Sequence, residues 1–209
     1  GIPSAKVFVT GIPISDRFLI NYDKNSLFLD FNLSPNKKNV LFFGGGEFGL
    51  GKNYTLKVFE TFVKDSADLQ IIAISGKNPK LKEAFENIVI KYNKEANVHI
   101  FEYTNMVPEL MSISNLVVTK PGGLTTSESL ASGLPIVVIN PIPGQEEENA
   151  TYLVKHNAAI WLKKDDNIEQ IVTNLLADSQ KLDEMSKNAK SISKPNATND
   201  ICKILLQTK

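Results

Sequence analysis

Short apolar runs alternate with segments of helical periodicity along most of the chain. Six apolar runs bounded by turn residues occur at Val40–Phe43, Gln70–Ser75, Val98–Tyr103, Leu116–Thr119, Ile136–Ile139 and Ala158–Leu162. Between them, apolar residues recur three or four positions apart, as at Leu81, Phe85 and Ile88. Continuous apolar strands that alternate with amphipathic helices are typical of a parallel sheet covered on both faces. The pattern therefore predicts a doubly wound α/β domain of Rossmann type.

The two ends of the chain add to this core. Helical periodicity continues at Ile168–Leu176, Gln180–Ala189 and Thr198–Leu206. The first residues differ, with a short apolar run at Lys6–Gly11 that suggests a strand, and a polar, Asn-rich stretch at Asn21–Lys38 that suggests a helix or linker. We predict an interdomain lead-in segment over residues 1–39 and a Rossmann-like domain over residues 40–209.

Composition and charge narrow the function classes. The 209 residues include 42% hydrophobic and 22% charged residues, with 23 Lys+Arg against 23 Asp+Glu, the mix of an ordinary globular protein. A neutral chain lacks the basic excess of a dedicated nucleic-acid binder, and no apolar run reaches the roughly 18 residues of a membrane span. Cys202 is the only cysteine, and we expect it to be buried in packing. With His99 and His156 far apart in sequence, we expect no metal site and no cofactor.

The basic residues are almost all lysine, since Arg17 is the only arginine. Bidentate guanidinium contacts to a phosphate are therefore unavailable elsewhere in the chain. Any other bound phosphate must be held by backbone N–H groups, helix N-termini, hydroxyl groups or lysine.

A glycine-rich loop follows the first predicted strand. Gly44, Gly45 and Gly46 open a formal G-x-G-x-x-G match that ends at Gly49. The dinucleotide fingerprint opens a helix at once and has an acidic residue about 20 positions later, after the second strand. Here the next helix is expected only from about Asn53, and Ser75–Asn78 follows the second strand. A nicotinamide site is therefore excluded, whereas a loop that approaches a phosphate, or a plain strand-to-helix turn, stays open.

A second glycine-rich loop follows the fourth predicted strand. Lys120, Gly122 and Gly123 precede Leu124 and a run of hydroxyl residues that begins at Thr125. A helix that begins here would point its free N–H groups at an anion. Glu128 is expected in the first turn, where it would interact with the helix dipole or accept hydrogen bonds from a ribose diol. The alternative is a capped helix with no ligand.

Two further strand ends carry polar candidates. Gln145 and Glu146 follow a proline-rich loop at the start of a predicted helix. The helix dipole alone explains carboxylates in a first turn. The amide of Gln145, beside a rigid loop, is suited to hydrogen-bonding the hydroxyl groups of a sugar. Phe101, Glu102 and Tyr103 end the third strand, where an aromatic ring can stack on a base or simply belong to the core.

Five motifs, in order, resemble one family over nearly the whole chain. They are VTGIPI at Val9–Ile14, FFGGGEFGLG at Phe42–Gly51, SGKN at Ser75–Asn78, TKPGGLTTSESLASGLPIV at Thr119–Val137 and NPIPGQEEENA at Asn140–Ala150. They resemble the C-terminal half of the diacylglycerol glycosyltransferases, which include plant monogalactosyldiacylglycerol synthases and bacterial processive diacylglycerol glucosyltransferases. The last two motifs are more similar to the bacterial enzymes. The GlcNAc transferase that makes lipid II is a more distant likeness.

The resemblance implies the C-terminal half of a GT-B fold, the half that binds a UDP-sugar without a metal ion. It places Gly44–Gly46 near the diphosphate, the segment Gly122–Thr125 on a phosphate, and Lys120 among the donor-binding residues. It assigns Glu128 to the ribose, Gln145 and Glu146 to the hexose, and Phe101–Tyr103 to the neighbourhood of uracil.

The resemblance also implies what this chain does not contain. In the family, a separate N-terminal domain binds the lipid acceptor and supplies the catalytic base, so no catalytic residue is assigned here. We expect an inverting transfer of glucose or galactose from UDP-hexose to diacylglycerol by the full-length protein. That protein is expected to be cytoplasmic and peripheral at the inner face of the membrane, while this chain alone is expected to be inactive. A lipid II-type transferase, a UDP-GlcNAc epimerase and a non-catalytic nucleotide-binding module remain alternatives.

Overall fold

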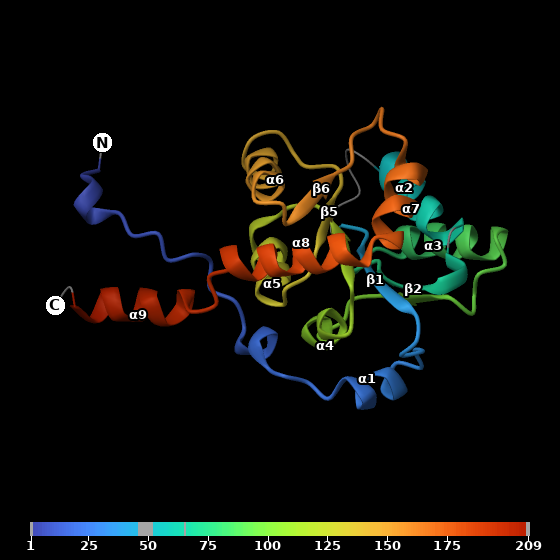
Figure 1. Ribbon diagram of the computed structural model, residues 1–209, viewed down its shortest axis with the longest axis horizontal. Helices are drawn as coiled ribbons and strands as arrows, with labels where there is room; N and C mark the ends of the chain where they lie inside the picture. The colour runs from blue at the N-terminus through green and yellow to red at the C-terminus, as the bar shows by residue number, and fades with distance from the viewer. Residues whose placement is uncertain (1, 46–51, 65, 208–209) are drawn as a thin grey trace.

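A six-stranded, all-parallel sheet forms the centre of the protein (Figure 1). The computed structural model describes residues 2–45, 52–64 and 66–207. The strands are β1 (Lys38–Phe43), β2 (Leu69–Ile74), β3 (Val98–Phe101), β4 (Leu116–Thr119), β5 (Ile136–Val138) and β6 (Ala159–Trp161), in the order β3-β2-β1-β4-β5-β6. Each strand falls on one of the six predicted apolar runs. The predicted doubly wound α/β fold is confirmed.

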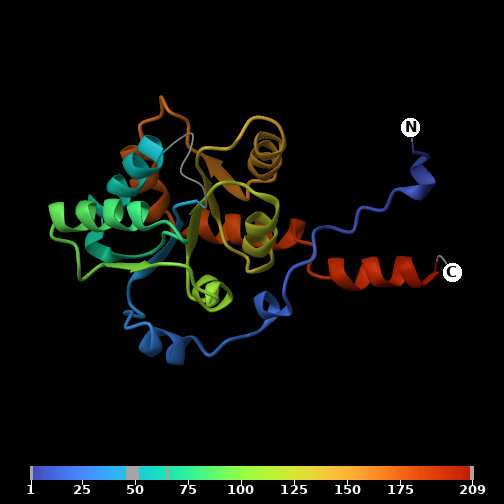
Figure 2. The same ribbon diagram turned by 180° about the vertical axis from the view of Figure 1, so that it is seen from behind.

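Helices cover both faces of the sheet (Figures 1 and 2). The chain forms α1 (Lys24–Asp30), α2 (Lys52–Lys64), α3 (Pro79–Lys91), α4 (Val107–Ser112), α5 (Gly123–Ala131), α6 (Gln145–Lys155), α7 (Ile168–Ala177), α8 (Ser179–Ile192) and α9 (Ala197–Gln207). Within the described residues, short 3-10 helices lie at Ser4–Lys6, Asp16–Leu19 and Ser66–Asp68. One apolar core includes α2, α3 and α7, and a second includes α1, α4, α5 and α6.

The alternation of side chains along each strand supplies both cores. In β1, Val40 and Phe42 join the core beneath α2 and α3, whereas Leu41 joins the opposite one. The Phe42 ring packs edge-on against Phe59 and Phe85, with centroid distances of 5.1 and 5.8 Å. Burying a side chain of this size contributes about 1.5–3 kcal/mol, and such ring pairs add about 0.5–1.5 kcal/mol.

The lead-in segment is fastened to the domain at several points. Leu27 of α1 and Leu33 are buried in the core on the α4 and α5 side. The guanidinium of Arg17 donates to a carboxylate oxygen of Glu109 in α4 across 2.6 Å. The strand predicted at Lys6–Gly11 is wrong: Lys6 ends a 3-10 helix, and the residues after it pair with no strand in the described chain. Without a neighbouring strand, an apolar run has no partner for its N–H and C=O groups.

The first residues and α9 project from the same side of the domain (Figures 1 and 2). A Cβ atom on Gly11 would lie 2.5 Å from Cβ of Lys194, so the two segments pass closely just before α9. Cys202 lies in α9 and is exposed, so the prediction that it is buried is wrong. The physical reason is that α9 leaves the sheet instead of packing on it.

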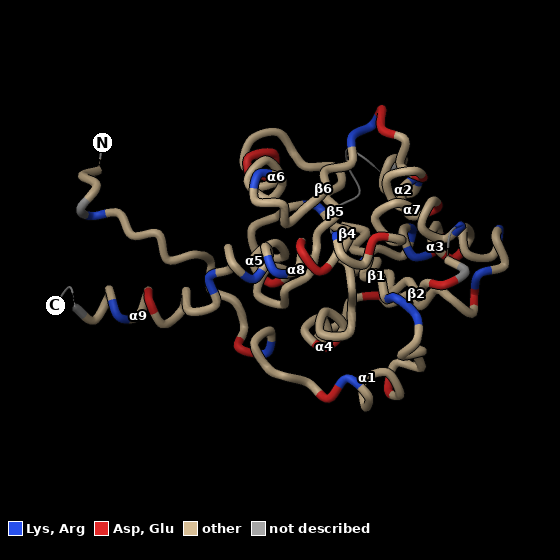
Figure 3. Tube along the Cα trace, in the orientation of Figure 1, with Lys and Arg blue, Asp and Glu red and all other residues tan. Residues whose placement is uncertain are grey.

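Both signs of charge are spread over most helices, and the first turn of α6 stands out as acidic (Figure 3). This distribution agrees with the zero net charge of the chain. Among the described residues, no helix has the length and apolarity that crossing a membrane requires.

Candidate functional site

The carboxyl ends of β1, β4 and β5 meet at one edge of the sheet. The strand order reverses between β1 and β4, since β1 lies between β2 and β4. In doubly wound sheets, ligands bind in the crevice at this switch point, outside the carboxyl ends of the strands. The three loops that follow β1, β4 and β5 are among the strand ends singled out in the sequence.

The two described glycines after β1 have different roles. The N–H of Gly44 donates to the carbonyl of Ile74 across 3.0 Å, which extends the sheet by one residue. A Cβ atom on Gly44 would lie 2.4 Å from Cδ2 of Leu81, so glycine is required for α3 to pack closely. Gly45 has φ +91°, and its Cβ position would lie 3.8 Å from Cε of Lys120. Gly45 therefore lies beside Lys120, while Gly46 lies outside the described residues.

The loop after β4 ends in an uncapped helix N-terminus. Gly122 is the N-cap of α5 and offers no side chain to the first N–H groups. The first intrahelical bond runs from the N–H of Thr126 to the carbonyl of Gly122 across 2.9 Å. The N–H groups of Gly123, Leu124 and Thr125 precede it, and such groups carry the positive end of the helix dipole. This end of α5 is therefore suited to an anion.

Apolar side chains border the same helix end. Leu124 is 60% exposed. A Cβ atom on Gly123 would lie 2.8 Å from Cδ1 of Ile12, so the lead-in segment lies against the start of α5. Next to it, Thr126 has a buried hydroxyl that finds no hydrogen-bond partner among the described residues. The lead-in segment thus forms part of the wall of the site.

Glu128 lies one turn later than predicted. Since α5 begins at Gly123, the first turn holds no acidic residue, and Glu128 belongs to the second turn. The expectation that it would face the helix dipole is wrong for this reason. Burial raises the pKa of the Glu128 carboxyl above its usual value. In the described chain no cation pairs with it, so it is a half-buried acceptor.

The loop after β5 is held in shape by α6. Gly144, with φ +96°, precedes Gln145, the first residue of α6, as predicted. Oε2 of Glu146 accepts a hydrogen bond from the N–H of Ile142 across 2.7 Å. The amide of Asn149 donates to the carbonyl of Pro121 across 2.9 Å, which ties α6 to the loop after β4. The two loops therefore form one surface.

Glu146 faces the neighbouring loop, and Gln145 is exposed. A Cβ atom on Gly122 would lie 3.9 Å from Oε1 of Glu146. The carboxylate of Glu146 therefore lies next to the N-cap of α5. Gln145 lies beside it with its amide open to solvent.

The residues that end β3 lie two strands away from β1. Phe101 packs edge-on against Phe31 at a centroid distance of 6.0 Å, in the core beside α4. Glu102 pairs with Lys82 across 2.8 Å. Tyr103 is 68% exposed, with Nζ of Lys77 5.0 Å from its ring centre. The structure thus brings together Gly45, Lys120, Gly122, Gly123 and Glu146, whereas the β3 residues form a separate flank.

Comparison with known protein families identifies the family of this chain. Residues 39–201 match the family model described as the glycosyltransferase family 28 C-terminal domain. The match covers more than half of the chain and includes all three loops. The chain belongs to this family.

Two curated relatives from Bacillus species share one name. Processive diacylglycerol beta-glucosyltransferase of Bacillus licheniformis is 36% identical over 198 residues, which are 95% of this chain and 50% of the relative. The protein of the same name from Bacillus subtilis is 35% identical over 99% of this chain and 53% of the relative. The chain therefore spans about half the length of the curated relatives it matches.

Solved structures share the fold of the family 28 domain. UDP-GlcNAc 2-epimerase from Neisseria meningitidis, bound to UDP-GlcNAc, has a TM-score of 0.75 at 22% identity, over 99% of this chain and 57% of that chain. Acinetobacter baumannii MurG has a TM-score of 0.67 at 22% identity, over 87% of this chain and 53% of that chain. The chain therefore has the Rossmann-like architecture of the C-terminal half of a GT-B protein.

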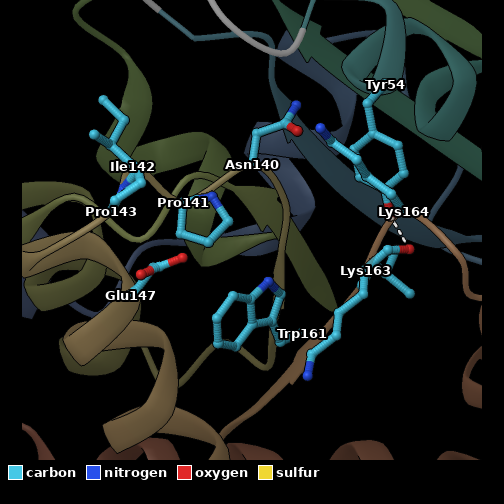
Figure 4. Close-up of a pocket in the computed structure, with 10 residues that line it drawn as sticks. Tyr54, Asn140, Pro141, Ile142, Pro143, Glu147, Trp161, Lys163 and Lys164 are labelled. Carbon is cyan, nitrogen blue, oxygen red and sulfur yellow. Dashed lines mark hydrogen bonds between the residues drawn. The ribbon is translucent and has the colours of Figure 1, made fainter.

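The family 28 domain also contains a cavity that the sequence patterns did not indicate. It has a volume of about 400 Å³ and opens beyond the ends of β5 and β6 (Figure 4). Tyr54, Asn140 and Trp161 are among its lining residues. The signal in the sequence was its single tryptophan at the end of a strand, separated by Leu162 from two lysines. The described residues of the domain contain no cluster of side chains able to hold a metal ion.

Proposed function

We propose that this family 28 domain binds UDP-glucose for a glycosyltransferase that acts on diacylglycerol. The observation that carries the proposal is the uncapped N-terminus of α5, with Lys120 and the Gly45 turn beside it. N–H groups and one ammonium suit a diphosphate in a chain whose only arginine pairs with Glu109 elsewhere. The names of the curated relatives favour glucose over galactose and diacylglycerol as acceptor.

The other parts of the donor are assigned by position. The diphosphate lies at Gly122–Thr125, with Gly44–Gly46 and Lys120 on its other side. Glu128 accepts hydrogen bonds from the ribose, and its raised pKa, caused by burial, marks a carboxylate that water solvates poorly. Gln145 and Glu146 contact the hexose, and Phe101–Tyr103 flank the uracil. A UDP-sugar that serves as substrate needs no further cofactor in this scheme.

The chemistry in the full-length protein is a displacement at the anomeric carbon. A lipid hydroxyl attacks that carbon, the bond to UDP breaks with its electron pair on the diphosphate, and an α-linked donor gives a β-glycoside. This domain contributes to catalysis by stabilising the negative charge that develops on the leaving diphosphate. Repeated transfer to one lipid, which the word processive in the relatives' names describes, is part of the proposal. The acceptor site and the base belong to a partner domain, at the cytoplasmic face of the membrane, so this chain alone binds donor without transferring sugar.

Isothermal titration with UDP and UDP-glucose tests the donor site. We expect UDP to bind the 209-residue chain, Glu128→Ala to lose nucleotide affinity, and Gln145→Ala to lose the preference for UDP-glucose over UDP. Glu148→Ala, which changes an exposed carboxylate in the same turn of α6, is the matched control. Absence of UDP binding at millimolar concentrations would overturn the proposal.

A second assay separates the transferase from its alternatives. The fold neighbours include a UDP-GlcNAc 2-epimerase. The full-length protein is expected to transfer glucose to diacylglycerol and not to a polyprenyl acceptor. Transfer to the polyprenyl lipid would favour the lipid II-type reaction, and epimerised UDP-GlcNAc would favour the epimerase.

A further inference from the structure

The cavity beyond β5 and β6 shares one loop with the candidate donor site. Pro141, Ile142 and Pro143 line it, and the same loop continues into Gln145 and Glu146. Its volume of about 400 Å³ falls within the range of small-molecule sites. A group bound there would therefore lie next to the proposed position of the donor hexose.

Hydrogen bonds to the main chain and to a neighbouring helix fix the walls of this cavity. The hydroxyl of Tyr54 donates to the carbonyl of Lys163 across 2.8 Å, which joins α2 to the loop after β6. The amide of Asn140 donates to the hydroxyl of Thr55 across 2.8 Å, which joins α2 to the loop after β5. Burial raises the pKa of Tyr54 to about 12, so its hydroxyl stays protonated as a donor. The cavity is therefore formed before any ligand arrives.

An indole ring forms part of the lining. Trp161 is half-buried, with Nζ of Lys163 5.2 Å from its ring centre. In the view of Figure 4, Glu147 and Lys163 lie on opposite sides of the indole, below Pro141. The side chains of Glu147 and Lys164 form no hydrogen bond or ion pair within the described chain, so their polar ends are available to a ligand.

This lining suits a sugar more than a simple anion or an acyl chain. A hexose has an apolar face of C–H bonds that packs on an aromatic ring, and hydroxyl groups that both donate and accept. The cavity offers an acceptor at Glu147 and donors at Lys163 and Lys164. At its mouth Ile142 is 53% exposed, which suits an apolar group attached to the sugar.

We propose that this cavity binds the sugar of a glycolipid, a β-glucoside with an apolar tail. The inference rests on the proposed function, because such a glucoside is the product of the proposed transfer. Trp161 stacks on the sugar ring. Glu147 accepts hydrogen bonds from the sugar hydroxyl groups, and Lys164 donates to them. The cavity thereby keeps a glycosylated lipid beside the incoming donor.

The fluorescence of Trp161 can report binding in this cavity, because Trp161 is the only tryptophan of the chain. We expect octyl β-D-glucoside, added below its micelle concentration, to give a saturable change in Trp161 fluorescence. Octyl tetraethylene glycol ether has the same tail without a sugar and is expected to give none. Equal responses to both would overturn the proposal in favour of a merely apolar cavity, and no response to the glucoside would also overturn it.

Two variants test the named contacts by calorimetry. Glu147→Gln and Trp161→Ala are each expected to weaken glucoside binding by about tenfold. Glu148→Gln changes the next carboxylate of α6, outside the cavity lining, and is expected to leave binding unchanged. Equal losses in Glu147→Gln and Glu148→Gln would contradict the proposal.

UDP titration of the same samples separates the two proposals. The Glu147→Gln variant is expected to bind UDP as the parent chain does. If the glucoside binds and UDP does not, the donor-site proposal fails while the sugar cavity stands. If UDP binds and the glucoside does not, the sugar cavity fails alone.

Discussion

Glu146 accepts a hydrogen bond from the main-chain N–H of Ile142, with 2.7 Å between Oε2 and the nitrogen. The bond closes the proline loop after β5 on the first turn of α6. Its other carboxylate oxygen faces the N-cap of α5, so one side chain connects the two loops of the candidate donor site. The shape of that site therefore depends on Glu146 before any ligand is considered.

Replacing Glu146 by alanine should cost stability as well as sugar recognition. Loss of the bond to Ile142 should lower the free energy of unfolding by about 1 kcal/mol, because the N–H loses its partner. Urea unfolding of Glu146→Ala and Glu148→Ala measures this, since both variants lose a first-turn charge of α6 but only one loses the hydrogen bond. Equal midpoints for the two variants would show that the bond contributes nothing.

The free energy of unfolding should fall as the pH rises through the range in which Glu128 loses its proton. Burial raises the pKa of this carboxyl in the folded state, so the folded chain binds more protons than the unfolded chain between the two pKa values. The contribution of Glu128 to stability is therefore full below the unfolded pKa and is lost as pH rises through the folded pKa. Glu128→Gln should be more stable than the parent at neutral pH and should lack this pH dependence.

Thermal unfolding from acid to neutral pH checks this expectation. Glu148→Gln is the control, since that carboxylate is exposed and lies outside the site. A Glu128→Gln variant that is less stable than the parent at neutral pH would contradict the sign.

Substitution of Gly44 and of Gly76 should destabilise the chain for different physical reasons. Gly44→Ala would place a Cβ atom 2.4 Å from Leu81 and 3.0 Å from Phe85, both buried, and overpacking of this kind costs about 1–3 kcal/mol. Gly76→Ala meets nothing within 4 Å, but its φ of +65° should cost about 1 kcal/mol. Urea unfolding measures both, and only Gly44→Ala should regain stability when Leu81 is shortened to valine.

The contact between the lead-in segment and α5 can be tested by a double-mutant cycle. Gly123→Ala would bring a Cβ atom to 2.8 Å from Cδ1 of Ile12, so alone it should destabilise the chain. Adding Ile12→Ala removes that atom and should recover most of the loss, a coupling of at least about 0.5 kcal/mol. Additive effects of the two changes, measured by urea unfolding, would mean that the segments do not touch.

The sheet could be predicted because its strands are buried on both faces. Runs such as Leu116–Thr119 and Ile136–Ile139 need no knowledge of neighbours, since a parallel strand between two helix layers is apolar throughout. The lead-in could not be predicted in the same way. Leu27 and Leu33 are buried in a core that residues of α4 and α5 also join, and Lys6–Gly11 has no strand partner in the described chain. Both outcomes depend on contacts distant in sequence.

The loops that form the candidate site could be predicted from the sequence. The positions of individual residues within those loops and helices were less predictable. Strand ends located Gly45, Lys120 and Gln145 at one edge of the sheet. A helix start that differed from the expected position moved Glu128 from the first turn of α5 to the second. The requirement for glycine at position 44 comes from α3, which the loop sequence does not contain. The cavity at Trp161 depends on α2, β5 and β6 together.

The uncapped start of α5 has a consequence for how the site responds to its surroundings. Gly122 offers no side chain, so the charge at this helix end comes from backbone amides. Amide groups have no proton to gain or lose in the physiological range, unlike histidine. The positive end of α5 therefore stays the same from acid to alkaline conditions, and any acidification of the cell would act on the groups around it.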